Sequence, residues 1–219
     1  MDSLITILEI IMINIVLSGD NAVVIAMASQ QLPEKQRNAA VWWGAFGAVA
    51  LRIVLTATAV ALLAVPYIQL AGALLLMYIA VKLLKDDSGH SKIRGAATLA
   101  SAVWTIIVAD FVMSLDNVLA VAAIAEGDWI LLGIGILISI PLIVWGSAFV
   151  MKLLQSYPLL VYIGSGILGF TAGEMVVEDE QVALWLTGLP FLLWVIPILG
   201  AAAVVAAGLW KRGRPVRVI

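Results

Sequence analysis

The sequence predicts an all-α membrane protein with seven transmembrane helices, built from two inverted three-helix repeats plus one extra C-terminal helix. Composition, the length of the apolar runs and an internal repeat carry this prediction. Hydrophobic residues make up 63% of the 219 positions, and Asp, Glu, Lys and Arg make up only 12%, whereas an average soluble domain is roughly 25% charged. So few polar side chains cannot cover a surface that faces water, which makes lipid the expected solvent.

Seven apolar runs are each long enough to cross a hydrocarbon core about 30 Å thick, which takes roughly 20 helical residues. The first run has no basic residue before it and is too long for a signal peptide, so we expect it to remain as helix one. Pro141, Pro190 and Pro197 are expected to kink their helices without ending them. The predicted spans are residues 4–29, 39–64, 67–85, 97–125, 129–152, 158–177 and 184–210.

The distribution of basic residues predicts the orientation of the helices, because cytoplasmic loops carry an excess of Lys and Arg. Eleven of the twelve basic residues fall around the loops after the first, third and fifth runs, or in the C-terminal tail: Lys35, Arg37, Lys82, Lys85, Lys92, Arg94, Lys152, Lys211, Arg212, Arg214 and Arg217. An even number of spans would destroy this segregation. We therefore expect a multi-pass protein of the cell membrane, with its N-terminus outside and its C-terminus in the cytoplasm.

An internal repeat divides the chain into two copies of three helices. Asn14-x3-Ser18-x-Asp20-Asn21 returns 96 positions later as Asp110-x3-Ser114-x-Asp116-Asn117, and Pro66, Gly72, Ala80 and Asp87 match Pro158, Gly164, Ala172 and Asp179 at an offset of 92. An odd number of spans inverts the second copy, as in many transporters whose substrate site lies near the midplane. We expect one membrane domain, 1–219, with repeat one at 4–85, a cytoplasmic linker at 86–96, repeat two at 97–177 and an extra helix at 184–210.

Five charged side chains lie within the predicted spans, where each costs about 2.5–3.5 kcal/mol on insertion scales. They are Glu9, Asp20, Arg52, Asp110 and Asp116. A structural ion-pair network is one interpretation, with Arg52 paired to one aspartate and the asparagines linking helices by hydrogen bonds. That network leaves more carboxylates than cations, so we favour a metal ion as the missing positive charge.

The spacing of the two motifs predicts that their oxygen-bearing side chains converge. Positions i, i+4 and i+7 of each motif share one helix face, and the aspartate before the last asparagine lies about 100° to the side. Carboxylate, carboxamide and hydroxyl oxygens suit Mg, Mn or Ca rather than Zn or Cu, and the chain has no Cys and a single His. The expected metal ligands are Asn14, Asp20, Asn21, Asp110, Asp116 and Asn117, with Arg52 as charge partner and Glu9 as a gate or proton carrier.

Two smaller patterns carry structural predictions. Residues 164–169 spell a G-x-G-x-x-G string, but no strand precedes it, so we reject a dinucleotide site and expect Gly169 and Gly173 to allow close helix packing. The acidic cluster at residues 178–180 is expected to form a solvated loop on the outer surface.

The paired motifs resemble the two signature sequences of the TerC family of integral membrane proteins, within the broader LysE-type transporter superfamily. The matching segments are Leu17-Ser-Gly-Asp20-Asn21-Ala-Val-Val-Ile-Ala26 and Ser114-Leu-Asp116-Asn117-Val-Leu-Ala-Val. The resemblance covers helices one to six, and the length is similar to that of the short, YjbE-like bacterial branch. It implies Mn(II) as the transported substrate and export as the direction of transport. Carried over by motif, the functional positions are Asp20, Asn21, Asp116 and Asn117, with Asp110 and Asn14 beside them.

Export of a divalent cation against an inside-negative potential costs about 4.6 kcal/mol per 100 mV, being two charges at roughly 2.3 each. Because the 219 membrane residues leave no room for a nucleotide-binding domain, we expect proton antiport, with Glu9 or a site aspartate as the carrier. The expected partners are the lipid bilayer and the metal ion. No resident cofactor and no nucleic acid are expected, since the formal net charge of −2 provides no basic surface; homo-oligomer formation stays open.

Two other classes of function stay open. An exporter of basic amino acids or other small solutes would fit the superfamily. An intramembrane aspartyl protease also needs two membrane-embedded aspartates that share one proton, and Ser18-Gly19-Asp20 faintly resembles the Gly-x-Gly-Asp of those enzymes. The protease reading gives no role to the asparagine that follows each aspartate, so we expect a transporter and not an enzyme.

Overall fold

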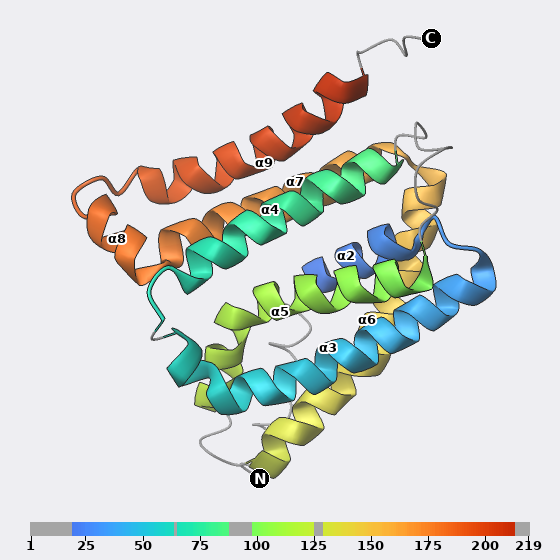
Figure 1. Cartoon of the computed structure of the whole chain (residues 1–219), viewed down its shortest axis with the longest axis horizontal. Coiled ribbons are helices and arrows are strands. Elements are labelled where there is room, and N and C mark those ends of the chain that lie inside the picture. Colours follow the sequence, from blue (N-terminus) through green and yellow to red (C-terminus); the bar gives the residue numbers. More distant parts are fainter. Residues whose placement is uncertain (1–18, 64, 88–97, 125–128, 213–219) are drawn as a thin grey trace. The chain divides into compact units, whose positions relative to one another are not determined.

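The computed structural model describes residues 19–63, 65–87, 98–124 and 129–212. Within these ranges every regular element is a helix and none is a strand (Figure 1), which confirms the all-α fold class. Helices keep their backbone hydrogen bonds internal, as an apolar solvent requires. The helices are α2 (Gly19–Ser29), α3 (Glu34–Leu63), α4 (Ile68–Asp87), α5 (Leu99–Ile124), α6 (Trp129–Ser156), α7 (Leu159–Glu178), α8 (Glu180–Leu186) and α9 (Leu192–Arg212).

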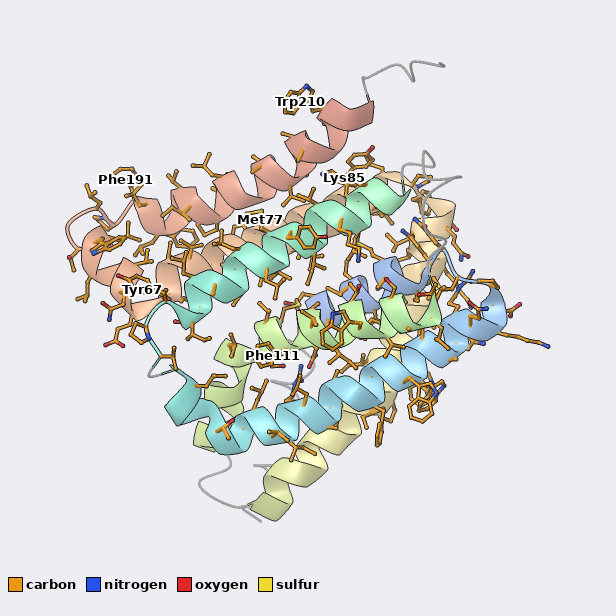
Figure 2. The ribbon with its side chains drawn as sticks, viewed as in Figure 1. Tyr67, Met77, Lys85, Phe111, Phe191 and Trp210 are labelled. Atoms are coloured by element: carbon orange, nitrogen blue, oxygen red, sulfur yellow. The ribbon has the colours of Figure 1, made fainter. Side chains whose placement is uncertain are left out.

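Four stretches among the described residues are long and apolar enough to cross a membrane. They are Glu34–Thr56, Ile68–Lys85, Leu159–Glu178 and Leu192–Trp210. Apolar side chains also cover the outside of the helices (Figure 2), and large ones such as Phe191 and Trp210 are mostly exposed. Because exposed aromatic and aliphatic side chains are stable in lipid but not in water, the helix lengths and their outer surfaces support a multi-pass membrane protein.

The helices group into two compact units. Unit 1 is residues 1–65 and 97–155, and unit 2 is residues 66–96 and 156–219. Unit 1 therefore combines α2 and α3 with α5 and α6, whereas unit 2 combines α4 with α7, α8 and α9. The predicted single domain and its repeat boundaries stay a prediction.

Glycines allow the helices of unit 1 to approach closely. In unit 1, α2, α3 and α5 pack on one another. A Cβ atom on Gly44 or Gly47 of α3 would lie 2.8 Å from Ile106 or 2.6 Å from Ile107 of α5, so only glycine fits there without a shift of these side chains. On α6, Gly146 faces Ala22 of α2.

Small residues also join α7 to α9 in unit 2. A Cβ atom on Gly169 would lie 2.6 Å from the carbonyl oxygen of Gly200, and one on Gly173 would lie 2.4 Å from the Cα atom of Pro197. Both distances are far below van der Waals contact, so the backbones of α7 and α9 touch. The prediction that Gly169 and Gly173 serve helix packing is confirmed, and Pro197 lies inside α9 as expected.

The predicted single helix over 184–210 is wrong. The structure has the short helix α8, a turn, and then α9, which begins at Leu192. Gly188 has a φ of +97° in this turn, a value that L residues rarely adopt. Pro190 follows and lacks an N–H group to continue a helix, so it separates two helices instead of kinking one. Pro141, by contrast, lies inside α6 as predicted.

The expectation of a solvated loop at 178–180 is wrong at Asp179, which is buried. Its Oδ1 atom accepts hydrogen bonds from the backbone N–H groups of Gln181 at 3.1 Å and Val182 at 3.2 Å, so Asp179 caps α8. Its Oδ2 atom accepts a hydrogen bond from the N–H group of Leu70 at 3.1 Å, in the first turn of α4. One carboxylate thus satisfies unpaired N–H groups at the starts of two helices.

Candidate cation site

A buried ion pair joins α3 to α5 in unit 1. The Nη2 atom of Arg52 lies 2.8 Å from Oδ1 of Asp110, and the two residues are only 3% and 6% exposed. The Nε atom of Arg52 donates a hydrogen bond to Oγ of Ser114 at 3.0 Å, and this hydroxyl donates to Oδ2 of Asp110 at 3.2 Å. The three side chains therefore close a ring of hydrogen bonds around both carboxylate oxygens.

Local helix geometry accounts for this ring. Asp110 and Ser114 are four residues apart on α5, so they share one face. Arg52 reaches that face because α3 packs on α5 at the glycines described above. Removal of one partner of so buried an ion pair lowers the stability of the folded protein by about 3–5 kcal/mol, because the other charge is left without compensation.

A second carboxylate, Asp20, lies at the start of α2. It is half-buried, and its Oδ1 atom accepts a hydrogen bond from the backbone N–H group of Asn21 at 2.8 Å. Asp20 interacts electrostatically with both Asp110 and Arg52. Unit 1 thus brings two carboxylates and one guanidinium into the same region, on three different helices.

The carboxamide of Asn21 is the unusual group of this region. Asn21 is 2% exposed, and within the residues that the structure describes neither its Oδ1 nor its Nδ2 atom has a hydrogen-bond partner. Buried polar side chains nearly always have a partner, because an unpaired one costs free energy. A carboxamide oxygen is also a suitable ligand for a hard cation.

The remaining predicted site residues lie partly or wholly outside the described residues. Asp116 and Asn117 are on the helical backbone of α5, but the structure does not describe their side chains. Asn14 and Glu9 lie outside the described ranges. Among the described residues, no three Asp, Glu, His or Cys side chains gather in one place. Of the six predicted ligands, the structure describes the side chains of Asp20, Asn21 and Asp110.

The motif spacing predicts for Ser114 only that its hydroxyl lies on the same helix face as Asp110 and Asn117. In the structure Ser114 bridges the guanidinium and the carboxylate of the ion pair. The i, i+4 spacing of Asp110 and Ser114 was a usable signal for their contact. No signal in the sequence indicated that Asp110, rather than Asp20 or Asp116, would bind Arg52.

Comparison with known proteins agrees with the paired motifs. The family model "Integral membrane protein TerC family" matches residues 1–215. The chain is 44% identical over 209 residues to the membrane protein YjbE of Bacillus subtilis (strain 168), covering 95% of this chain and 96% of that protein. It is 31% identical over 126 residues to the membrane protein YceF of the same organism, covering 53% of this chain and 49% of YceF.

A longer protein, YegH of Escherichia coli (strain K12), is 26% identical over 191 residues, covering 78% of this chain and 36% of YegH. No solved structure matches the chain. The motif resemblance, the helical fold and the match over nearly the full length lead to one conclusion: the chain belongs to the TerC family of integral membrane proteins.

Proposed function

We propose that the protein is a divalent metal cation transporter of the cell membrane, with Mn(II) as its substrate and export as its direction. The observation that carries the proposal is in unit 1, where Arg52 pairs with Asp110, the second carboxylate of Asp20 lies within electrostatic range of both, and the buried carboxamide of Asn21 has no hydrogen-bond partner among the described residues. One carboxylate is left over after Arg52 is paired. A cation that binds there would compensate this charge, which a purely structural network leaves unexplained.

The chemistry of the ligands supports a hard cation. The described side chains offer carboxylate, carboxamide and hydroxyl oxygens, which suit Mg, Ca and Mn. The chain has no cysteine that would favour zinc or copper. Mn(II) in particular, and export as the direction, are what the resemblance of the two motifs to the TerC signature sequences implies. We propose Asn14, Asp116 and Asn117 as further ligands, because the second motif repeats the first on α5.

We also propose the seven-span, inverted-repeat architecture. The helices α5 and α6 contain 26 and 28 residues, enough to span a membrane by length. The two units divide the chain after residues 65 and 155, which are nearly equivalent positions in the two repeats. Asp179, just after α7, binds the first turn of α4, so these matching helices are antiparallel, as inversion requires.

The proposed orientation places the N-terminus outside and the C-terminus in the cytoplasm. Arg37 near the start of α3 and Lys152 near the end of α6 line one cavity. These two helix ends therefore lie on the same side of unit 1, as the positive-inside rule predicts from their loops. We expect neither enzymatic activity nor a resident cofactor.

Proton antiport is the proposed source of energy, with Glu9 or a site aspartate as the proton carrier. The test uses the purified protein in proteoliposomes loaded with Mn(II). Release of Mn(II) should accelerate when an inward proton gradient is imposed, since protons moving down that gradient would drive the metal outward. A response to a sodium gradient alone would contradict the proton mechanism, and release of loaded lysine but not of Mn(II) would favour the amino-acid exporter.

A further inference from the structure

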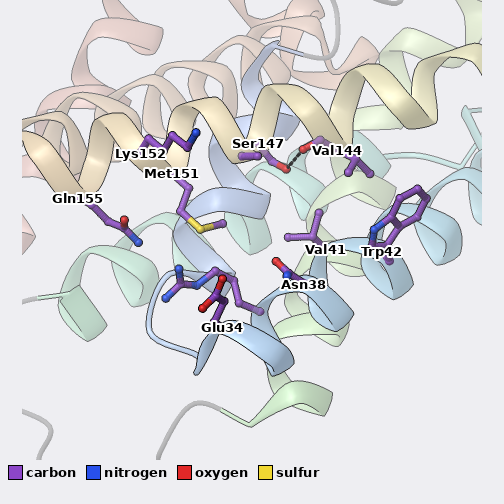
Figure 3. Close-up of a pocket in the computed structure, with 11 residues that line it drawn as sticks. Glu34, Asn38, Val41, Trp42, Val144, Ser147, Met151, Lys152 and Gln155 are labelled. Carbon is purple, nitrogen blue, oxygen red and sulfur yellow. Dashed lines mark hydrogen bonds between the residues drawn. The ribbon is translucent and has the colours of Figure 1, made fainter.

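A cavity of about 240 Å³ lies between the start of α3 and the end of α6, inside unit 1 (Figure 3). Its described lining includes neither residue of the Arg52–Asp110 pair and no residue of either motif. Besides Ser147, the polar residues of the lining are Glu34, Arg37, Asn38, Lys152 and Gln155. They all lie in the first two turns of α3 or the last two turns of α6, which form one end of the cavity.

The lining becomes apolar further along both helices. Val41 and Trp42 follow the polar turns of α3, and Val144 and Met151 precede those of α6. Ser147 also lines the cavity, but its hydroxyl donates to the carbonyl oxygen of Val144 at 2.9 Å. The cavity is therefore amphiphilic along its length, with a polar helix-end region and an apolar region toward the helix interiors.

The charge of the polar region is net positive. Two cationic side chains, Arg37 and Lys152, and one exposed carboxylate, Glu34, line it. Lys152 forms no ion pair with any residue that the structure describes. A region with two cations attracts an anion and repels a divalent metal ion, so the cavity is unsuitable as an entrance for the proposed substrate.

The guanidinium of Arg37 uses only part of its hydrogen-bonding capacity. Its Nη2 atom donates to the carbonyl oxygen of Leu32 at 3.1 Å and more weakly to that of Gln30 at 3.5 Å, at the connection between α2 and α3. Its Nε atom is buried and has no partner within the described residues. The backbone thus holds the guanidinium in place, and no carboxylate among the described residues forms an ion pair with it.

We propose that this cavity binds the headgroup of an anionic phospholipid. Arg37 and Lys152 compensate the phosphate, and the carboxamides of Asn38 and Gln155 bind headgroup hydroxyls. Cavities of about 300 Å³ or more hold whole small-molecule ligands, so 240 Å³ suits a headgroup whose acyl chains remain in the bilayer. Trp42, 57% exposed at the apolar end, is placed to lie against those chains. Basic pockets between transmembrane helices on the cytoplasmic side are typical headgroup sites.

The test measures lipid binding to the full-length protein by native mass spectrometry and thermal unfolding, and needs no transport assay. The probes are phosphatidylglycerol, phosphatidylcholine and inorganic phosphate. We expect phosphatidylglycerol alone to bind and raise the melting temperature. One basic residue near a membrane surface contributes about 1 kcal/mol to the binding of anionic lipid, so Lys152→Gln should weaken phosphatidylglycerol binding about fivefold. Lys152→Glu should weaken it more.

Lys35→Gln is the matched control, because Lys35 is an exposed basic residue of the same region of α3 that does not line the cavity. Asn38→Leu removes a headgroup contact without changing the charge and should also weaken binding. If Lys35→Gln weakened phosphatidylglycerol binding as much as Lys152→Gln, general surface charge would explain the binding and the proposal would be overturned. Equal binding of phosphatidylcholine, or of inorganic phosphate, would overturn it as well.

Discussion

Arg52 places a guanidinium near the middle of α3, where Asp110 and Ser114 of α5 accept its hydrogen bonds. At the 92-residue offset of the later repeat matches, its counterpart is Val144, so this positive charge is an asymmetry within otherwise matching repeats. Asp20 is within electrostatic range of the pair, and the buried carboxamide of Asn21, the next residue, has no hydrogen-bond partner among the described residues. At the scale of single residues, the proposed transport would depend on how these carboxylates and the guanidinium of Arg52 share one region with the transported cation.

Replacement of Asp20 or Asp116 by Asn tests the ligands directly. The change preserves size and hydrogen bonding but removes half of the negative charge that would balance a divalent ion, and hard cations bind carboxylate far better than carboxamide. We expect Asp20→Asn and Asp116→Asn each to abolish Mn(II) transport while the protein still folds. The measurement is transport into or out of proteoliposomes together with melting temperature with and without Mn(II).

At Mn(II) about 100-fold above its Kd, wild-type protein should gain about 2.7 kcal/mol, a shift of several degrees for a chain of this size. Asp179→Asn is the matched control, because it makes the same chemical change at a carboxylate that caps helices in unit 2. It should keep the Mn(II)-induced shift. Site variants that also keep the wild-type shift would show that these aspartates are not ligands.

Replacement of Arg52 by Ala tests the role of the ion pair. The change strands the buried carboxylate of Asp110, so we expect a loss of about 3–5 kcal/mol in stability. If Arg52 compensates the site when the metal is absent, return of the empty carrier should slow more than metal binding weakens. Separate measurements of Mn(II) binding and of Mn(II) exchange across proteoliposomes distinguish these two steps.

The double variant Arg52→Met with Asp110→Asn removes both charges together. It should recover part of the stability lost in Arg52→Ala, because no uncompensated charge remains. Normal turnover in Arg52→Ala would leave the residue with a structural role only.

At the scale of helices, small residues and caps decide which surfaces meet. Gly169 and Gly173 bring α7 into backbone contact with α9. Without a hydrophobic driving force in lipid, such close van der Waals packing is a main source of helix association. Asp179 adds a polar tie between the start of α4 and α8. In unit 2, contacts between residues far apart in the sequence therefore hold α4, α7 and α9 together.

Gly173→Leu tests this packing. A leucine side chain would collide with the backbone around Pro197 of α9, so we expect the helices to separate and stability to fall by about 1–3 kcal/mol or more. Gly166→Ala is the control, because a Cβ atom there would lie an ordinary 3.5 Å from Val205. Thermal unfolding of both variants in detergent gives the comparison. Equal melting temperatures would show that the α7–α9 contact contributes little.

At the scale of the whole molecule, composition and helix length indicate several membrane passes, while orientation rests on the segregation of basic residues. The chain has no cysteine, so single cysteines can report on orientation without background. Two exposed positions are suitable: Lys35 in the first turn of α3, and Leu189 in the turn between α8 and α9. The seven-span topology places them on opposite sides of the membrane.

We expect Leu189→Cys to react with a membrane-impermeant maleimide in intact cells, and Lys35→Cys to react only after the membrane is opened. The measurement is the labelled fraction of each variant before and after permeabilisation. The reverse pattern would invert the orientation, and labelling of both sites from outside would contradict an odd number of spans between the two positions.

The sequence alone determined the helical class, the helix positions from residue 34 to 178, and the purpose of Gly169 and Gly173. These features depend on the solvent and on local spacing, since lipid requires internally hydrogen-bonded helices and small residues mark close contacts. The paired motifs also placed Asp20, Asn21 and Asp110 among the candidate ligands.

Only the tertiary structure decided which groups meet. Arg52 and Asp110 are 58 positions apart, and their pairing follows from the packing of α3 on α5 rather than from any local pattern. The break between α8 and α9 depends on a glycine at positive φ, and the burial of Asp179 depends on N–H groups from two helix starts. Spacing determines which side chains share a helix face, but packing decides what that face touches.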